Sequence, residues 1–383
     1  MKPFGTDLAR RKLRVAAPVT RKLAIVATVC LAAAAALLAG PGARAAVVLP
    51  APAITVADGN SVIATATDTF GLNFYWNQYG TDTWHTEQVT TSQKIAESAP
   101  SVAQVGNDVV IAARGADNSL WVFWQVNGTS GWNPVLVNGP NTTFSAPVIA
   151  ADGSAAIMTA AGPGNSLDFY WAPGSPAGWL GQTAATASTT YSDPAMTVND
   201  GSVNIAVEGP NNSLDFYWAQ NGTWATQGPA AWVGEVVAGA GSDGNDPAIA
   251  PTGSAVDIVV GAPNSLMPNF YWAYNGTTQW VPGRVPEFDR AASAVVPYPG
   301  ALHVVNVDSF GALQSLSDAN GTGVWTSTDI TGFNTEQSVP AVTMNGSSEN
   351  IAVFDSLGNL DFYWADGGGT FHGETVDASG DAL

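Results

Sequence analysis

The chain has 383 residues, of which 46% are hydrophobic and 11% charged, with 14 Trp and a single Cys. Eight of its twelve Lys and Arg residues fall within residues 1–45. Residues 46–383 therefore hold four basic and thirty acidic side chains, a net charge of −26. So few cations exclude a protein that binds nucleic acid through its phosphates or grips anionic lipid. Cys30 lies in the N-terminal segment, which excludes a disulfide framework, a thiolate metal site or a cysteine nucleophile in residues 46–383.

Residues 1–45 have the pattern of a secretory signal peptide. Basic residues crowd the segment before residue 23, residues 23–38 are apolar, and Ala43-Arg44-Ala45 offers small residues for cleavage after Ala45. The apolar run is short for a membrane span. Arg10-Arg11 leaves the twin-arginine export route open, and a retained signal anchor is the alternative for the whole segment. We expect a cleaved signal and a secreted, soluble mature chain over residues 46–383.

Residues 46–383 contain one motif seven times. The string Leu-x-Phe-Tyr-Trp recurs at steps of 45–54 residues, in close or degenerate copies that end at Trp76, Trp124, Trp171, Trp218, Trp272, Ser317 and Trp364. A proline lies 24 or 25 residues before the terminal Trp in six copies, and a second Trp follows the first in most of them. These independent marks stay in register, which predicts a tandem repeat with units that start near residues 52, 100, 147, 194, 247, 293 and 340.

Each repeat has the pattern of four short strands. The first strand follows the proline, and a turn such as Asp58-Gly59 leads into a second, apolar strand. The aromatic string is the third strand, and an Asn-Gly-Thr turn leads to the fourth, which carries the second Trp. No stretch has a helical period, and the extra residues 226–231 of repeat four are expected to form a loop. The pattern predicts an all-β fold: a seven-bladed β-propeller of four-stranded antiparallel blades.

Repeat two carries a more specific motif. It contains Ala113-Arg114-Gly115-Ala116-Asp117-Asn118-Ser119-Leu120-Trp121, followed by Gly131-Trp132. This segment resembles the repeat of the bacterial seven-bladed propeller lectins of the PLL type. The resemblance in repeat phase covers residues 46–383, whereas the motif is close in repeat two only. It implies that fucose or related glycans bind in pockets between adjacent blades.

The candidate ligand-binding residues combine rings with polar groups. Two residues apart on one strand, a carboxylate and a Tyr share a face and offer a sugar an aromatic platform and fixed acceptors. The alternative is that the Tyr packs between blades while the Asp satisfies a turn. Arg114 either binds a sugar hydroxyl or pairs with Asp117 or with a carboxylate of a neighbouring blade. The candidates are Arg114, Asp117, Trp121, Asp168, Tyr170, Asp215, Tyr217, Asp361 and Tyr363.

Catalysis is the rival function class. The carboxylates of Glu208, Glu235 and Glu374 keep a glycoside hydrolase as an alternative, since such enzymes need two carboxyl groups at a defined separation. The seven similar repeats favour binding over catalysis, because an enzyme needs one asymmetric set of catalytic residues whereas binding sites can recur in each repeat. The three histidines, His85, His303 and His372, lack metal-ligand spacing and are expected to be surface or interface residues.

We therefore expect a monomeric, non-catalytic binder of neutral glycans that needs no metal or cofactor. Several pockets in one ring would make it multivalent. A structural or protein-interaction propeller without sugar affinity is the alternative.

Overall fold

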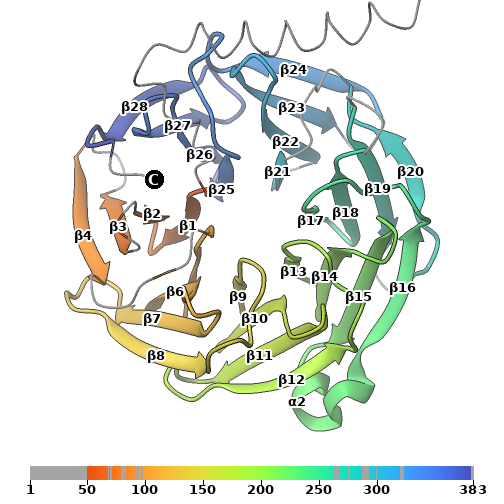
Figure 1. Ribbon diagram of the computed structural model, residues 1–383. Helices are drawn as coiled ribbons and strands as arrows, with labels where there is room; N and C mark the ends of the chain where they lie inside the picture. Colours follow the sequence, from red (N-terminus) through yellow and green to blue (C-terminus); the bar gives the residue numbers. More distant parts are fainter. Residues whose placement is uncertain are drawn as a thin grey trace, which may run out of the picture. The chain divides into compact units, whose positions relative to one another are not determined.

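The computed structural model describes residues 50–380, apart from residues 68, 70, 79–82, 91–94, 96–97, 263–266, 275–276, 287–292, 299 and 320–322. The expected signal segment lies outside the described residues. The described residues belong to one compact unit, which begins at Val48. Seven four-stranded sheets form a ring in this unit (Figure 1). The predicted seven-bladed β-propeller is confirmed.

Each blade is an antiparallel meander of four consecutive strands. The first strands surround the axis and are β1 (Ala53–Ala57), β5 (Ser101–Val105), β9 (Val148–Asp152), β13 (Ala195–Asn199), β17 (Ala248–Thr252), β21 (Ser293–Tyr298) and β25 (Ala341–Asn345). The second strands are β2 (Asn60–Ala66), β6 (Asp108–Arg114), β10 (Ala155–Ala161), β14 (Ser202–Glu208), β18 (Ala255–Val260), β22 (Ala301–Val307) and β26 (Ser348–Phe354).

The aromatic strings form the third strand of each blade, as the repeat pattern predicts. These strands are β3 (Leu72–Asn77), β7 (Leu120–Val126), β11 (Leu167–Pro173), β15 (Leu214–Gln220), β19 (Asn269–Tyr274), β23 (Leu313–Ala319) and β27 (Leu360–Asp366). The fourth strands form the outer wall and are β4 (Trp84–Thr90), β8 (Asn133–Asn138), β12 (Leu180–Ala185), β16 (Val233–Ala238), β20 (Val281–Arg284), β24 (Trp325–Asp329) and β28 (His372–Asp377).

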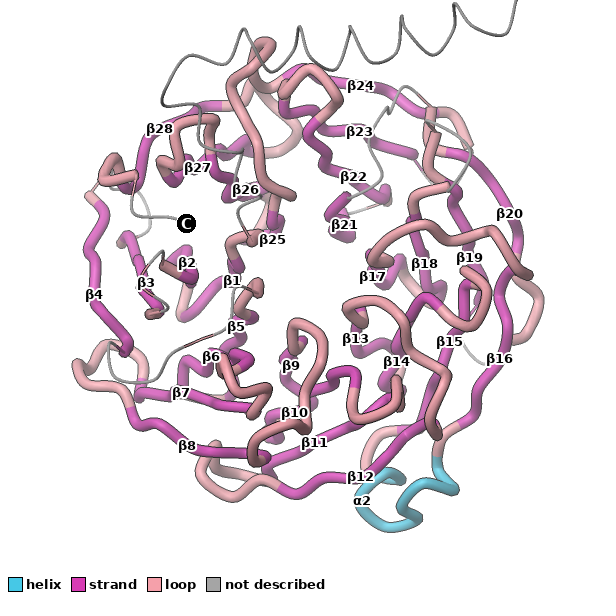
Figure 2. The backbone as a smooth tube through the Cα atoms, in the orientation of Figure 1, coloured by secondary structure: helices cyan, strands magenta, loops and turns pink. Residues whose placement is uncertain are grey.

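The segment between β15 and β16 departs from the prediction. The extra residues of repeat four were expected to form a loop, but they belong to α2 (Thr223–Gln227) and the 3₁₀ helix η1 (Gly228–Ala231) (Figure 2). The coiling lets Trp224 bury its ring against Phe169 and Trp171 of the preceding blade, with ring centroids 5.9 and 6.4 Å apart. Among the residues that the structure describes, no helix is long and apolar enough to cross a membrane.

Two of the predicted Asp-Gly turns between first and second strands have the expected geometry. Asp58 and Gly59 have φ angles of 49° and 82°, and Asp200 and Gly201 have 46° and 76°. Positive φ at both central residues is the geometry of the two-residue turn whose twist matches that of the paired strands.

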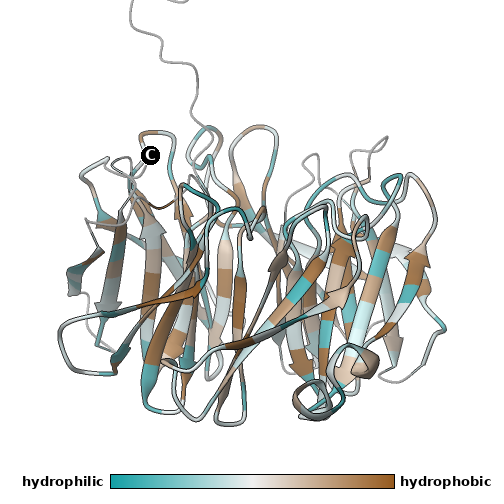
Figure 3. Cartoon of the chain, turned by 60° about the horizontal axis from the view of Figure 1, so that its bottom comes forward, coloured by the Kyte–Doolittle hydropathy of each residue, from teal (hydrophilic) through white to brown (hydrophobic). Residues whose placement is uncertain are grey.

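The apolar core is divided among the interfaces between neighbouring blades. Leu, Phe and Trp of a third strand face the following blade, whereas its Tyr faces the preceding one. Phe74 meets Trp132 of the next blade edge-on at 5.0 Å, and Phe169 meets Trp232 in the same way at 4.8 Å. Each buried aromatic ring removes roughly 150–250 Å² from water, so these contacts hold the blades together. Apolar positions accordingly alternate with paler ones along the strands (Figure 3).

The ring closes between the first and the last blade without a shared sheet. Strands β25 to β28 complete blade seven alone, and β25 lies against β1. Tyr75 donates from its hydroxyl to Asp377 Oδ2 at 2.7 Å, and Asn350 Nδ2 donates to Ser61 Oγ at 2.7 Å. The closure is therefore a side-chain interface of the same kind as the other six.

Candidate functional site

Three cavities lie between neighbouring blades, at the end of the ring that carries the Asp-Gly and Asn-Gly-Thr turns. Their volumes are about 980 Å³ between blades one and two, 360 Å³ between blades two and three, and 450 Å³ between blades six and seven. Each is lined by the first turn of one blade and by the third strand and following turn of the next, and the cavities between blades one and two and between blades six and seven are lined also by the second, third and fourth strands of the first blade of the pair. The cavities are thus three versions of one structural position.

The cavity between blades one and two has an aromatic wall. Phe74 and Trp76 stack at 5.7 Å with an interplanar angle of 23°, and Trp76 stacks on His85 at 5.2 Å and 25°. Trp76 and His85 are adjacent because they are paired across β3 and β4. Phe74 is buried, Trp76 is half-buried and His85 is exposed, so the row of rings runs from the core out to solvent.

Polar side chains organise the rim of the same cavity. Asp58 accepts hydrogen bonds from Gln104 Nε2 and Asn127 Nδ2, both at 2.7 Å, and these two bonds hold the pKa of Asp58 below its ordinary value. Glu87 Oε1 accepts the backbone N–H of Gly131 at 3.1 Å. The hydrogen bond between the predicted turns at Asp58 and Asn127 therefore joins blades one and two. Asn221 Nδ2 forms the equivalent bond to Asp152 Oδ1 between blades three and four, at 2.7 Å.

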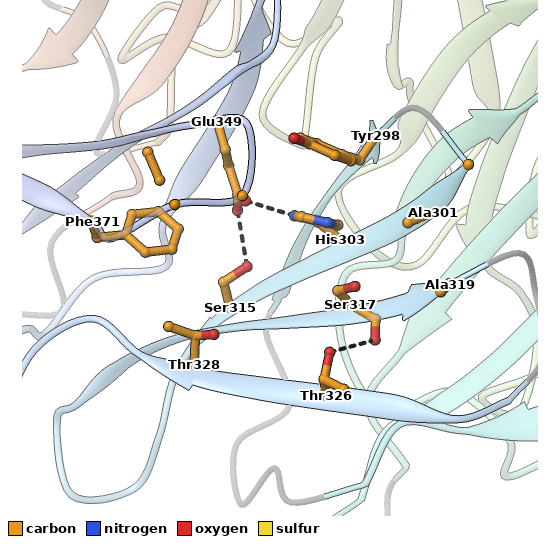
Figure 4. Close-up of a pocket in the computed structure, with 14 residues that line it drawn as sticks. Tyr298, Ala301, His303, Ser315, Ser317, Ala319, Thr326, Thr328, Glu349 and Phe371 are labelled. Atoms are coloured by element: carbon orange, nitrogen blue, oxygen red, sulfur yellow. Dashed lines mark hydrogen bonds and ion pairs between the residues drawn. The ribbon is translucent and has the colours of Figure 1, made fainter.

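The cavity between blades six and seven has a different lining (Figure 4). Ser315 and Ser317 stand on β23 where other third strands carry aromatic residues. His303 Nδ1 lies 2.6 Å from Glu349 Oε2, and Ser315 donates its hydroxyl to Glu349 Oε1 at 3.0 Å. The Tyr298 ring lies flat on the His303 ring, with centroids 4.5 Å apart at 12°. A hydroxyl-rich, ionisable wall replaces the aromatic one.

The repeat-two candidates lie at the opposite ends of the strands. Arg114 ends β6 and Trp121 follows the start of β7, so both are remote from the Asp-Gly turn. Asp117 accepts the backbone N–H of Ser119 at 3.1 Å and also its hydroxyl, and that hydroxyl accepts the indole N–H of Trp121 at 2.8 Å. Trp121 is half-buried against the core shared by blades one and two. Asp117 therefore caps its own turn, and its carboxylate makes no ion pair with Arg114 in the described part of the chain.

Arg114 acts instead on a carboxylate from the linker between blades three and four. Burial raises the pKa of Asp193 to about 6, helped by the negative charge of Asp246 and opposed by the Ala146 N–H and by the guanidinium of Arg114. Asp193 Oδ1 accepts the backbone N–H of Ala146 at 2.8 Å, which links two consecutive blade entrances. No ion pair joins Arg114 to Asp193 or to another carboxylate among the described residues, so its influence on Asp193 is electrostatic at longer range.

The Asp-x-Tyr pairs share a face of their strands, as predicted, and that face is turned into the preceding interface. Asp168 accepts the hydroxyls of Ser166 at 3.2 Å and Thr183 at 3.1 Å, and Asp215 accepts that of Ser213 at 2.9 Å. Asp168 and Asp215 are buried and Asp361 is partly buried, and burial raises the pKa of each of the three.

The tyrosines of these pairs point at the preceding linker or outer strand. Tyr170 accepts Asn138 Nδ2 at 3.0 Å, and Tyr363 donates to Glu336 Oε1 at 2.8 Å. Burial raises the pKa of Tyr170 to about 12, and burial together with the Glu336 charge raises that of Tyr363. Tyr217 is half-buried in the interface between blades three and four. All three tyrosines therefore also have a packing role.

Of the three carboxylates considered for glycoside hydrolysis, Glu208 and Glu235 belong to blade four and Glu374 to blade seven. Glu235 and Glu374 occupy the same position on their outer strands, and each accepts the indole N–H of a Trp from the next blade, at 3.2 Å from Trp280 and 2.8 Å from Trp84. Glu208 accepts Asn212 Nδ2 at 2.7 Å. None of these bonds joins two of the three carboxylates.

Repeat substitutions are the sequence signal for the cavity between blades six and seven. His303 was expected to be a surface or interface histidine, and it is buried at an interface, but its pairing with Glu349 was not anticipated. The replacement of Phe and Trp by Ser315 and Ser317 was visible as a degenerate repeat. Among the described residues, no group of three or more His, Cys, Asp or Glu is placed to hold a metal ion.

Comparison with solved structures finds a similar fold in two proteins named as lectins and in a prolyl endopeptidase. The BP39L lectin from Burkholderia pseudomallei superimposes with a TM-score of 0.74 at 19% identity, over 86% of this chain and all of that one. The SapL1 lectin, solved in complex with alpha methyl fucoside, has a TM-score of 0.52 at 12% identity, over 74% and 97% of the two chains. A prolyl endopeptidase reaches 0.54 at 12% identity and covers 93% of this chain, which matches 55% of that one.

At these identities the likeness establishes the fold. No family model matches the chain, and no curated protein matches its sequence.

Proposed function

We propose that this protein is a non-catalytic, glycan-binding β-propeller that holds a neutral sugar in the cavity between blades one and two. The observation that carries the proposal is the row of Phe74, Trp76 and His85 rings opposite a polar rim. A sugar presents apolar C–H faces and a belt of hydroxyls, and it is best held by an aromatic platform with a few fixed polar groups.

The rim supplies those fixed groups. Asp58 and Glu87 are acceptors whose positions are set by bonds to Gln104, Asn127 and Gly131, so little ordering is left to occur on binding. The likeness to structures named lectins supports the same ligand class, and SapL1 is named with a fucoside. Fucose and related neutral sugars are therefore the first ligands to test.

The repeat suggests weak but multiple binding. The cavity between blades two and three occupies the same structural position as the one between blades one and two. Shallow sugar sites bind with millimolar to micromolar constants, roughly −4 to −8 kcal/mol, so useful avidity requires several sites on one glycan-bearing surface. In this proposal residues 1–45 export the chain, and the mature protein acts outside the cell as a monomer.

A second proposed site for the same ligand class is the sequence-based set at the other end of the ring. Arg114, Asp117 and Trp121 form its repeat-two copy. The other copies are the Asp-x-Tyr pairs Asp168/Tyr170, Asp215/Tyr217 and Asp361/Tyr363.

A protein-interaction propeller is the alternative function, and one surface favours it. Phe310, Phe333 and Leu357 are 60%, 72% and 77% exposed, and the first two rings are in edge-on contact at 5.6 Å. Ser356 next to Leu357 donates its backbone N–H to Thr335 O at 3.0 Å, which joins the Leu357 turn to the segment that carries Phe333. Exposed apolar groups gathered in this way are typical of a protein contact.

A glycan array with fucosylated, methylated and cell-wall sugars tests the proposed function. We expect binding by the mature wild-type chain and its loss in Trp76→Ala. Trp272→Ala removes the same repeat residue from blade five and is the matched control, which should keep binding. If folded protein binds no sugar on the array, the result favours the protein-interaction propeller. If Trp76→Ala binds as well as the wild type, the sugar binds at another site.

A further inference from the structure

The cavity between blades six and seven breaks the repeat at several positions. Ser317 stands where the other six repeats have Trp, and Ser315 stands where five have Phe and one has Val. On the facing blade, Glu349 occupies a position that is never ionisable elsewhere, being held by Ser61, Val109, Ala156, Val203, Val256 and Leu302. Three changes from packing residues to polar ones therefore meet in one interface.

These changes are unfavourable for packing. The blade pairs joined by Phe and Trp rings gain an edge-on aromatic contact, whereas Ser315 faces Phe371 across a cavity of about 450 Å³. Glu349 is 3% exposed and His303 8%, and burying ionisable groups costs free energy even when they are paired. Polar groups that converge on a cavity in this way mark a candidate binding site.

The lining of the cavity selects the charge of a ligand. Among the described lining residues there is no Lys, Arg, Asn, Gln or Trp, so no cationic or amide side chain of that set faces a carboxylate, a phosphate or an acetamido carbonyl. Glu349 accepts from His303 and Ser315 and keeps further lone pairs, since a carboxylate offers about four. A neutral His303 that donates from Nδ1 presents Nε2 as another acceptor, and Nε2 has no partner among the described residues.

Hydroxyls and rings complete an acceptor-rich site. Ser317 and Thr328 present hydroxyls to the cavity, and Tyr298 and Phe371 form aromatic walls (Figure 4). A primary ammonium brings three donors and no acceptor, and its charge is attracted both by a carboxylate and by aromatic faces. The volume lies in the range that holds a single sugar ring or a molecule of that size.

We infer that the cavity between blades six and seven is a binding site for a small primary-amine ligand, such as an amino sugar with a free ammonium group, held by the carboxylate of Glu349. This site is separate from the cavity between blades one and two, and it differs in chemistry because its ligand is a cation. The net charge of −26 over residues 46–383 favours the approach of such a ligand over long range.

Titration calorimetry with three probes that differ at one position tests the inference. D-Glucosamine carries the ammonium, D-glucose a hydroxyl and N-acetyl-D-glucosamine a neutral amide in its place. We expect glucosamine to bind at neutral pH and the other two to bind at least about tenfold more weakly at this cavity. Equal binding of glucose and glucosamine by the Trp76→Ala variant, in which the proposed neutral-sugar cavity between blades one and two is disabled, would overturn the inference, as would no heat from glucosamine at tens of millimolar.

Two variants locate the binding. Glu349→Gln keeps the shape and removes the charge, and it should weaken glucosamine binding at least about tenfold, whereas Glu87→Gln removes one charge from the other cavity and should leave it unchanged. Ser317→Trp restores the residue of the other six repeats and should fill the cavity, so it should abolish binding in a folded protein even if Glu349→Gln fails to fold. Binding that survives Ser317→Trp places the amine elsewhere and overturns the inference. Trp76→Ala should not change glucosamine binding at the cavity between blades six and seven. A failure of the proposed neutral-sugar site can therefore be told apart from a failure of this inference.

Discussion

Trp84 of the first blade packs edge-on against Phe362 of the last, with ring centroids 5.0 Å apart at an interplanar angle of 69°. Its indole N–H also reaches Glu374 Oε1 of the last blade at 2.8 Å. The same pair of contacts joins blades four and five, where Trp280 meets Phe216 at 5.0 Å and Glu235 at 3.2 Å. The closure of the ring is therefore one more copy of an interface that the repeat already encodes, and it needs no exchanged strand.

Truncation of Trp84 tests this equivalence. We expect Trp84→Ala to lower the free energy of unfolding by about 3 kcal/mol, the lower end of the range for aromatic truncations, because the ring is half-buried. Trp280→Ala is the matched variant at an interface within the chain, and it should cost about the same. Chemical denaturation followed by Trp fluorescence measures both. A cost near zero at Trp84 with a full cost at Trp280 would show that blades one and seven are not in contact in solution.

A glycine opposite a tyrosine gives a second prediction. Gly181 pairs with Tyr170 across β11 and β12, and a Cβ at Gly181 would lie 2.6 Å from Tyr170 Cδ1. Gly181→Ala should therefore force the ring off its position and cost about 1–3 kcal/mol of stability. Gly139→Ala has nothing within 4 Å of its Cβ and should be neutral or slightly stabilising. Thermal melts of the two variants that differ by less than the error of the measurement would contradict the steric argument.

The repeat phase was enough to predict the architecture, because a propeller blade has strong local marks. The aromatic string, the proline before it and the Asp-Gly turns each recur in register, and each maps onto one strand or turn of the blade. The helical segment α2 was missed because its burial depends on a contact between Trp224 and Phe169 of another blade. Periodicity within five residues carries no information about such a contact.

The candidate sites were harder to predict, because the sequence does not show at which end of the strands the cavities between blades lie. The Asp-x-Tyr pairs do lie on one face, but the face is an interface in which Asp168 and Tyr170 find partners within the protein. The pair of Glu349 and His303 joins residues 46 positions apart in adjacent blades. The alignment of repeats contained the signal, since Ser317 replaces an aromatic residue of the other copies, but the neighbour across the interface had to come from the structure.

Buried carboxyl groups predict an unusual pH dependence. Burial is the main cause that raises the pKa of Asp193 and Asp257 to about 6, Glu336 to about 7 and Asp243 to about 8. Because these values lie above those of the unfolded chain, the folded state binds more protons between about pH 4 and pH 8. The contribution of these groups is fully present below about pH 4 and is lost as pH rises through 6 to 8.

The free energy of unfolding should accordingly fall from pH 5 to pH 8.5. The fall is up to about 1.4 kcal/mol for each pH unit by which burial raises the pKa of a group. Glu336→Gln keeps an acceptor for Tyr363 and removes one titration, so it should flatten the profile between pH 5 and pH 8. Asp366→Asn changes an exposed carboxylate and is the control. A melting temperature that rises from pH 5 to pH 8.5 in the wild type would be incompatible with neutral buried carboxyls.

Two tryptophans distinguish the two proposed glycan sites, which lie at opposite ends of the strands. Both rings pack on the core shared by blades one and two, but the indole N–H of Trp121 is already bonded to Ser119, whereas Trp76 also lines the cavity beside His85. We expect Trp121→Ala to lower the melting temperature and keep sugar binding, and Trp76→Ala to lose binding. Binding by both variants is measured on the sugar that scores highest on the array, with circular dichroism to confirm the fold. If Trp121→Ala abolishes binding in a folded chain while Trp76→Ala retains it, the Arg114, Asp117 and Trp121 set is the site and the cavity between blades one and two is not.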